Sequence, residues 1–173
     1  GAPASGKSTF FLSIAGLWNW GTGRILTPPL ASVLFLSQRP FLAHGTLRAA
    51  LTFSVPDPKV AGGDLHAVLA RVGIEHLAAS LEKEAAWDKQ LNDDEQRRVV
   101  LARMILARPA WVISDEAIDL GDAAMRDLVV SIFGKELAGA ALLDISGRDA
   151  RDPFSTRTVQ LVAAAPGDSK KAS

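Results

Sequence analysis

The chain of 173 residues carries 19 basic and 19 acidic side chains and therefore has no formal net charge. This balance argues against nucleic acid as a general partner and against electrostatic binding to a membrane surface. The chain has no cysteine, which excludes a disulfide framework and a thiolate metal site. Its length suffices for one domain with a hydrophobic core, and no stretch reaches the roughly 18 apolar residues of a membrane span.

The chain begins with the phosphate-binding motif G-x-x-x-x-G-K-[ST]. The motif consists of Gly1, Ala2, Pro3, Ala4, Ser5, Gly6, Lys7, Ser8 and Thr9. Its glycines allow the loop to turn backbone N–H groups toward a diphosphate, Lys7 can reach the β- and γ-phosphates, and the Ser8 hydroxyl can bind magnesium. The alternative is a glycine-rich surface loop without a ligand. Because this motif normally follows a buried strand, we interpret the chain as the C-terminal portion of a larger protein.

An apolar helical face is predicted directly after the loop, and its positive end would point at the phosphates. The residues that share this face are Phe10, Phe11, Ile14 and Leu17. Two strands are then expected, over 24–26 and 32–37, with a turn at Pro28-Pro29 between them.

Helical spacing dominates the next part of the chain, from 46 to about 81, and a longer helix is predicted over 93–107 with Pro109 as its stop. The remaining predicted elements are strands over 111–114, 140–145 and 156–162 and a helix over 123–133. This alternation predicts an α/β fold with a mostly parallel sheet flanked by helices. We expect one domain over 1–165, with a helical subdomain inserted at about 46–108, and a disordered tail over 166–173.

An acidic pair, Asp115 and Glu116, follows the short apolar strand over 111–114. In such an arrangement the aspartate holds magnesium, and the adjacent glutamate polarises the water that attacks a γ-phosphate. A solvated turn is the alternative, but the phosphate-binding motif upstream favours the catalytic interpretation. Ser114 stands where an aliphatic residue is expected.

Gln38 ends the strand over 32–37. A lone glutamine is normally a surface amide, but the surrounding residues 36–42 and 45–48 resemble the Q-loop of ABC-transporter ATPases. The resemblance extends to residues 14–25 and to 91–103, which occupies the place of the family's signature segment, and Asp122 fits the D-loop aspartate. The match is closest to half-transporters that fuse a membrane domain to the ATPase, of the bacterial peptide and cobalamin uptake type and the peroxisomal fatty-acyl type.

The resemblance implies a P-loop NTPase fold whose N-terminal strands are missing from this chain. It implies ATP and magnesium as ligands, with Ser8, Gln38 and Asp115 at the metal and Glu116 as the catalytic residue. The implied partners are a transmembrane domain fused upstream of residue 1 and a second ATPase domain, which would clamp ATP between its signature and this chain's loop. The implied location is the cytoplasmic face of a membrane, in particular a bacterial inner membrane.

The signature segment departs from the family pattern. The family has Leu-Ser-x-Gly followed by Glu or Gln, and this chain has Leu91, Asn92, Asp93, Asp94 and Glu95. These carboxylates suit a helix start. A carboxylate about 4 Å from a phosphate charge costs on the order of 4 kcal/mol at an effective dielectric near 20. We therefore expect Asp94 to weaken an ATP-closed dimer.

A second departure concerns the histidine with which the family holds the γ-phosphate. Aligned through Ser146 and Arg148, that position is Gly147. The three histidines of the chain lie well upstream and are expected to be ordinary surface residues: His44, His66 and His76. The D-loop pattern is also altered, at Asp119 and Gly121.

These patterns predict the ATP-binding domain of an ABC transporter, which couples ATP binding and hydrolysis to transport. The alternative is a degenerate module that binds ATP with little or no hydrolysis, because the intact loop supports nucleotide binding and the two departures weaken the case for fast turnover. A GTPase or a small-molecule kinase is disfavoured, since the chain has no N-K-x-D motif and the order of its motifs is not that of a kinase.

Overall fold

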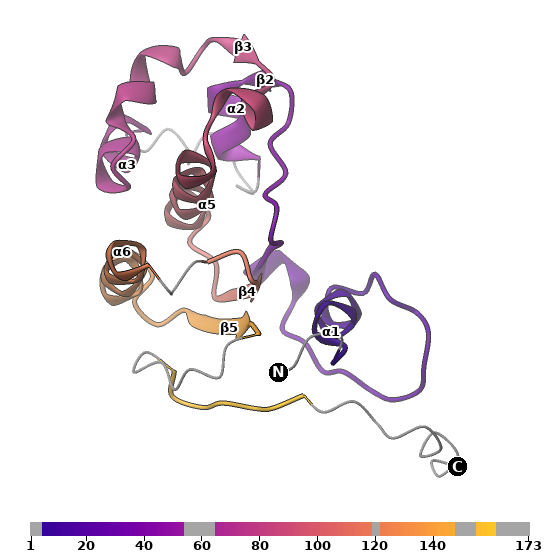
Figure 1. The fold of residues 1–173 in the computed structure, drawn as a ribbon. Coiled ribbons are helices and arrows are strands. Elements are labelled where there is room, and N and C mark those ends of the chain that lie inside the picture. Colours follow the sequence, from indigo (N-terminus) through magenta and orange to yellow (C-terminus); the bar gives the residue numbers. More distant parts are fainter. Residues whose placement is uncertain (1–4, 54–64, 119–121, 148–154, 162–173) are drawn as a thin grey trace.

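The computed structural model describes residues 5–53, 65–118, 122–147 and 155–161 (Figure 1). Several predicted features lie outside these residues: Gly1 to Ala4 of the phosphate loop, Asp119 and Gly121, Arg148, and the tail over 166–173. In chain order the described elements are α1 (Lys7–Ile14), η1 (Leu30–Ser32), β1 (Val33–Leu36), β2 (Gly45–Thr46), α2 (Leu47–Thr52), α3 (Leu65–Arg71), η3 (Glu75–Ser80), β3 (Glu84–Ala85), α4 (Trp87–Gln90), α5 (Asp93–Ala107), β4 (Trp111–Asp115), α6 (Ala123–Gly134) and β5 (Ala141–Ile145).

Three parallel strands form the main sheet, in the order β1-β4-β5. Ile113 in the middle of β4 is aligned with Phe35 on one side and with Leu143 on the other. Val112, Ile113 and Ser114 are buried, as expected for a parallel strand covered on both faces. The predicted α/β fold with a parallel sheet and flanking helices is therefore confirmed.

Helices cover both faces of this sheet (Figure 1). On one face, Phe11 and Ile14 of α1 pack against Ile113 and Ile145. On the other face, Val112 belongs to the large core that α2, α3, α5 and α6 share. Since successive side chains of a strand alternate between its faces, Asp115 lies on the α1 face together with Ile113.

A block of helices, α2 to α5, lies between β1 and β4 in the sequence and stands above the sheet in Figure 1. It includes a short antiparallel ladder in which β2 pairs with β3. The indole N–H of Trp87 donates to the Gly45 carbonyl at 2.9 Å, which attaches α4 to this ladder. The insertion of helices between two strands of the sheet agrees with the sequence prediction.

Local signals define the ends of the longest helix. α5 spans 15 residues from Asp93 to Ala107, as predicted. Asn92 caps its start by accepting from the Glu95 N–H, and the Glu95 carboxylate accepts from the Asn92 N–H in return. At the other end Arg108 turns into the left-handed region at φ 44°, and Pro109 follows.

Two predicted strands are wrong. Residues 24–26 form no strand, and Ile25 and Leu26 are 50% and 80% exposed. The described part of the segment over 156–162, residues 156–161, also forms no strand. A strand is stabilised by pairing with a neighbouring strand. The central strand β4 already pairs with β1 on one side and with β5 on the other, so it offers neither predicted segment a partner. Apolar composition alone was therefore not enough to make either segment a strand.

The predicted apolar face of the first helix is only partly correct. Phe11 and Ile14 are buried, but α1 ends at Ile14, and Leu17 beyond it is 72% exposed. In the part of the chain that the structure describes, no helix has the length and apolar character needed to cross a lipid bilayer.

Candidate nucleotide-binding site

Three segments meet at the carboxyl end of the sheet, around Glu116. This residue follows β4 with a positive φ of 54°, and its N–H donates to the Ile145 carbonyl at 3.1 Å. One carboxylate oxygen, Oε1, accepts from the Gly147 N–H at 3.1 Å. The other, Oε2, lies 3.5 Å from the Gln38 amide nitrogen, which is a long hydrogen bond. Glu116, the predicted catalytic residue, therefore has as neighbours Gln38, the predicted Q-loop residue, and Gly147, which stands where the resemblance implies a histidine.

The described part of the phosphate loop leads into α1. Gly6 has a φ of 86°, which favours glycine, and its carbonyl accepts the first helical hydrogen bond from Phe10 at 2.8 Å. Lys7 and Ser8 occupy the first turn of the helix, where its N–H groups and its dipole favour an anion. Since α1 covers the face on which Asp115 lies, the helix start and the acidic strand end belong to the same side of the sheet.

The chemistry of these residues fits magnesium. Mg²⁺ is typically held by one or two carboxylates together with phosphate oxygens and waters, not by a cage of protein ligands. Asp115 is half-buried at the strand end, while Ser8 and Gln38 offer exposed oxygens. No group of three or more His, Cys, Asp or Glu side chains able to hold a metal occurs among the described residues.

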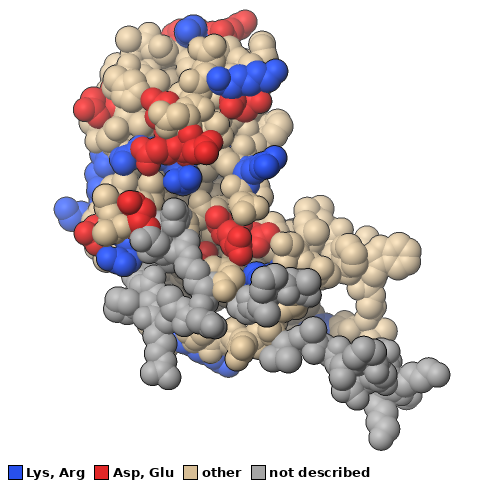
Figure 2. Space-filling model, in the orientation of Figure 1, with Lys and Arg blue, Asp and Glu red and all other residues tan. Residues whose placement is uncertain are grey.

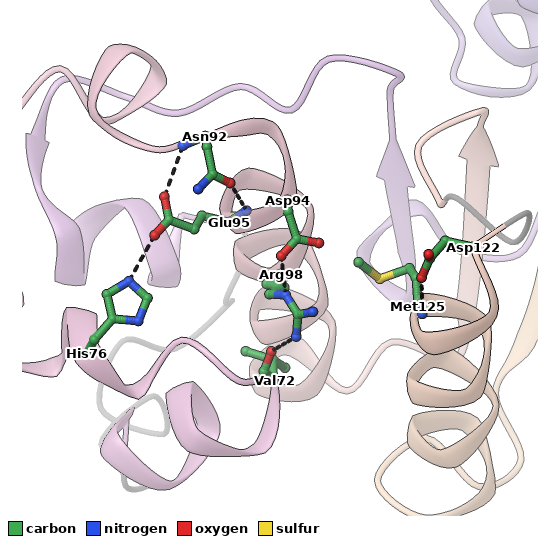
Figure 3. A network of polar contacts seen from close by, with 8 residues as sticks. All are labelled: Val72, His76, Asn92, Asp94, Glu95, Arg98, Asp122 and Met125. Carbon is green, nitrogen blue, oxygen red and sulfur yellow. Dashed lines mark hydrogen bonds and ion pairs between the residues drawn. The ribbon is translucent and has the colours of Figure 1, made fainter.

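The segment in the place of the signature is a well-capped helix start (Figure 3). Asn92, which replaces the family's serine, supplies the cap described above. The Glu95 carboxylate completes the capping box and also lies 2.8 Å from the His76 ring nitrogen. Asp94 does not cap the helix, because its carboxylate accepts from Arg98 one turn further along at 2.6 Å. The expectation that carboxylates suit this helix start is correct for Glu95, whereas the cap itself is the side chain of Asn92.

The histidines are surface residues, as predicted. His44, His66 and His76 are all exposed, and none lies on the segments that meet at Glu116. Acidic and basic side chains are interspersed on the face shown in Figure 2, so this face has no stripe of one charge sign. At the position where the family has a histidine, the described structure has the Gly147 backbone N–H in contact with the Glu116 carboxylate.

Sequence reasoning missed the role of Arg103. This arginine is 5% exposed in the middle of α5, and burial lowers its pKa to about 10. It donates to the Ala50 carbonyl at 2.7 Å and to the Phe41 carbonyl at 2.8 Å. It therefore joins the signature helix to α2 and to the segment that begins at Gln38. The signal available in the sequence was a charged residue within the apolar run over 99–106.

Ser114 has no comparable contact. Its side chain is completely buried, and its hydroxyl has no hydrogen-bond partner in the described structure. A buried hydroxyl without a partner costs free energy. The departure from an aliphatic residue therefore destabilises β4.

The phosphate loop at the start of a helix, the acidic end of the adjoining parallel strand and the glutamine beside it define a P-loop nucleotide-binding domain. Comparison with known proteins specifies the class further. The family model described as ABC transporter matches residues 1–119, and the chain belongs to this family.

The relatives agree with this assignment. An uncharacterized ABC transporter ATP-binding protein of Haemophilus influenzae is 33% identical over 148 residues, which cover 86% of this chain and 25% of the relative. The ATP-binding cassette sub-family D member 3 of Mus musculus is 28% identical over 161 residues, covering 86% of this chain and 23% of the relative. The chain thus spans about a quarter of the length of these proteins.

A solved structure supports the fold. The structure of a bacterial Atm1-family ABC exporter with ATP bound superposes with a TM-score of 0.69 at 19% sequence identity. The match covers 85% of this chain and 28% of the exporter chain. The predicted family, including its similarity to sub-family D proteins, and the predicted ATP-binding domain are therefore confirmed.

Proposed function

We propose that this domain binds ATP with magnesium and hydrolyses it slowly, and that it couples these events to transport across a membrane. The observation that carries the proposal is the convergence of Gln38, Glu116 and Gly147 at the end of the strand beside α1. In this arrangement the residues that would sense the γ-phosphate come from three segments far apart in the sequence.

Each proposed residue has a distinct task. The loop formed by Gly1, Ala2, Pro3, Ala4, Ser5, Gly6, Lys7, Ser8 and Thr9 would hold the phosphates, with Lys7 at the β- and γ-phosphates. Ser8, Gln38 and Asp115 would hold magnesium, which when bound neutralises charge on the transferred phosphoryl group. Glu116 would accept the proton of the attacking water.

The surroundings of Glu116 indicate why hydrolysis should be slow. Its two oxygens accept from the backbone of Gly147 and from Gln38, so the carboxylate is oriented. The backbone N–H that replaces a histidine side chain cannot reach out to a γ-phosphate. Glu116 would therefore be a well-positioned base that has no histidine side chain beside it to orient the water.

The proposed partners follow from the family. We propose a transmembrane domain fused upstream of residue 1, at the cytoplasmic face of a bacterial inner membrane, and a second ATPase domain in a dimer with ATP at the interface. The greater length of the relatives supports the fusion. An exposed aromatic pair, Phe41 and Phe53, lies close to the Gln38 segment, with ring centroids 5.3 Å apart, and would contact the membrane domain. We also propose that residues 1–165 form one domain and that the helical subdomain is inserted at about 46–108.

The test compares steady-state ATP hydrolysis of the full-length protein with that of its Glu116→Gln and Lys7→Ala variants. Lys83→Ala serves as a matched control for the loss of a lysine, because Lys83 is exposed and lies before β3 in the helical block. We expect a low rate that both site variants abolish and the control retains. Equal residual rates in all of them would refute hydrolysis. ATP binding without any turnover would instead identify a degenerate nucleotide-binding module.

A further inference from the structure

Three carboxylates occupy the first turn of α5, where the family has a small residue near the partner's nucleotide. Two of them are engaged within the protein. Glu95 belongs to the capping box and contacts His76, and Asp94 pairs with Arg98. The Asp94 side chain is still 54% exposed, so its position relative to an incoming anion depends on how firmly Arg98 is held.

Arg98 is fixed by contacts that do not involve Asp94. Its Nη1 donates to the Val72 carbonyl at 2.7 Å, just beyond the end of α3. A Cβ atom added to Gly73 would lie 2.8 Å from the same nitrogen, so the glycine leaves room for the guanidinium. The Arg98 side chain is only 24% exposed. An arginine anchored in this way loses little further freedom when its Nε–H donates to a carboxylate.

The direction of the Asp94 carboxylate follows from this anchor. Its Oδ2 lies 2.6 Å from Arg98 Nε, one turn toward the interior of the helix (Figure 3). The carboxylate is thus drawn back along the flank of α5 instead of extending beyond its amino end. The opposite charges also form a nearly neutral pair, whose field falls off more steeply with distance than that of a single charge.

We propose that Arg98 is a positioning residue for the signature segment, which holds the carboxylate of Asp94 away from the phosphates of a nucleotide bound to a second copy. This inference rests on the proposed ATP-dependent dimer and concerns only its regulation by charge. It also modifies the expectation that Asp94 weakens an ATP-closed dimer. The ion pair with Arg98 reduces the repulsion between the Asp94 carboxylate and a phosphate relative to that of an unpaired carboxylate. Without Arg98, the acidic signature would oppose closure of the dimer.

The test measures ATP-driven pairing of two copies by energy transfer between labelled full-length molecules, in a Glu116→Gln background that prevents turnover. Arg98→Met should raise the ATP concentration for half-maximal pairing by at least about tenfold, because the freed carboxylate faces the phosphates. Adding Asp94→Asn should restore pairing to within about threefold, whereas Asp94→Asn alone should change it less than about threefold. Arg97→Met removes a cation from the same helix and should have no such effect.

Different failures have different meanings. If Arg98→Met weakens ATP-driven pairing equally in the parent and in the Asp94→Asn background, Arg98 has a merely structural role and the inference is overturned. A tenfold gain from Asp94→Asn alone would show that Arg98 does not neutralise the carboxylate, and this result stands even if Arg98→Met fails to fold. Binding of a fluorescent ATP analogue is measured in parallel. If no variant, including the parent, binds it, the proposed function itself is refuted.

Discussion

Replacement of Arg103 by methionine should destabilise the domain by about 2 kcal/mol. The arginine donates to the carbonyls of Ala50 and Phe41, and hydrogen bonds from a charged group contribute roughly 1.5–3 kcal/mol each. Burial opposes this gain. Burial lowers the pKa of Arg103 to about 10, a fall that corresponds to about 3 kcal/mol of lost hydration, and methionine would not incur this cost. Since the two hydrogen bonds outweigh this cost, the variant should be less stable.

The assay is equilibrium urea unfolding of Arg103→Met, with Arg97→Met on the same helix as the control. The control should lie within about 0.5 kcal/mol of the parent, because Arg97 is not deeply buried. The variant should also loosen the segment beyond Gln38, which amide hydrogen exchange at Phe41 to Leu51 would detect. An Arg103→Met protein as stable as the parent would refute the reasoning and indicate that desolvation cancels both hydrogen bonds, as it does in some buried ion pairs.

Three further outcomes are expected. Ser114→Ala should raise the free energy of unfolding by about 1 kcal/mol, because it removes a buried hydroxyl without a partner; a loss of stability would contradict this. The hydrogen bond from Arg71 lowers the pKa of Glu136 below its ordinary value near 4.5, so Glu136→Gln should cost about 0.5–1 kcal/mol at neutral pH. That stabilisation is complete above the unfolded pKa and is lost as the pH falls through the folded one, so in unfolding curves the difference between variant and parent should begin to shrink below about pH 4.5 and vanish only below the lowered folded pKa. Asp94→Gly together with Gly147→His should raise the steady-state ATPase rate, most of the gain coming from the histidine; a double variant that binds ATP but is no faster would contradict our account of slow turnover.

The local elements of the fold could be predicted from the sequence because their signals are local. The carboxylates at its start and Pro109 after its end predicted α5, and the structure has the predicted limits of 93–107. The short apolar run before Asp115 predicted β4 in the same way. The strand predicted over 24–26 failed, because a strand is stabilised by a neighbour that no local pattern specifies.

The sequence by itself determined the family and the order of the motifs, because the spacing of the phosphate loop, Gln38 and the acidic pair is a property of the chain. Only the tertiary structure decided which of these groups touch. Gly147 and Gln38 both reach the carboxylate of Glu116, although they lie 31 and 78 residues away in the chain. The partners of Asp94 and Arg103 were also decided in three dimensions. Burial and neighbouring charge decide what a side chain does, and packing of distant segments sets both.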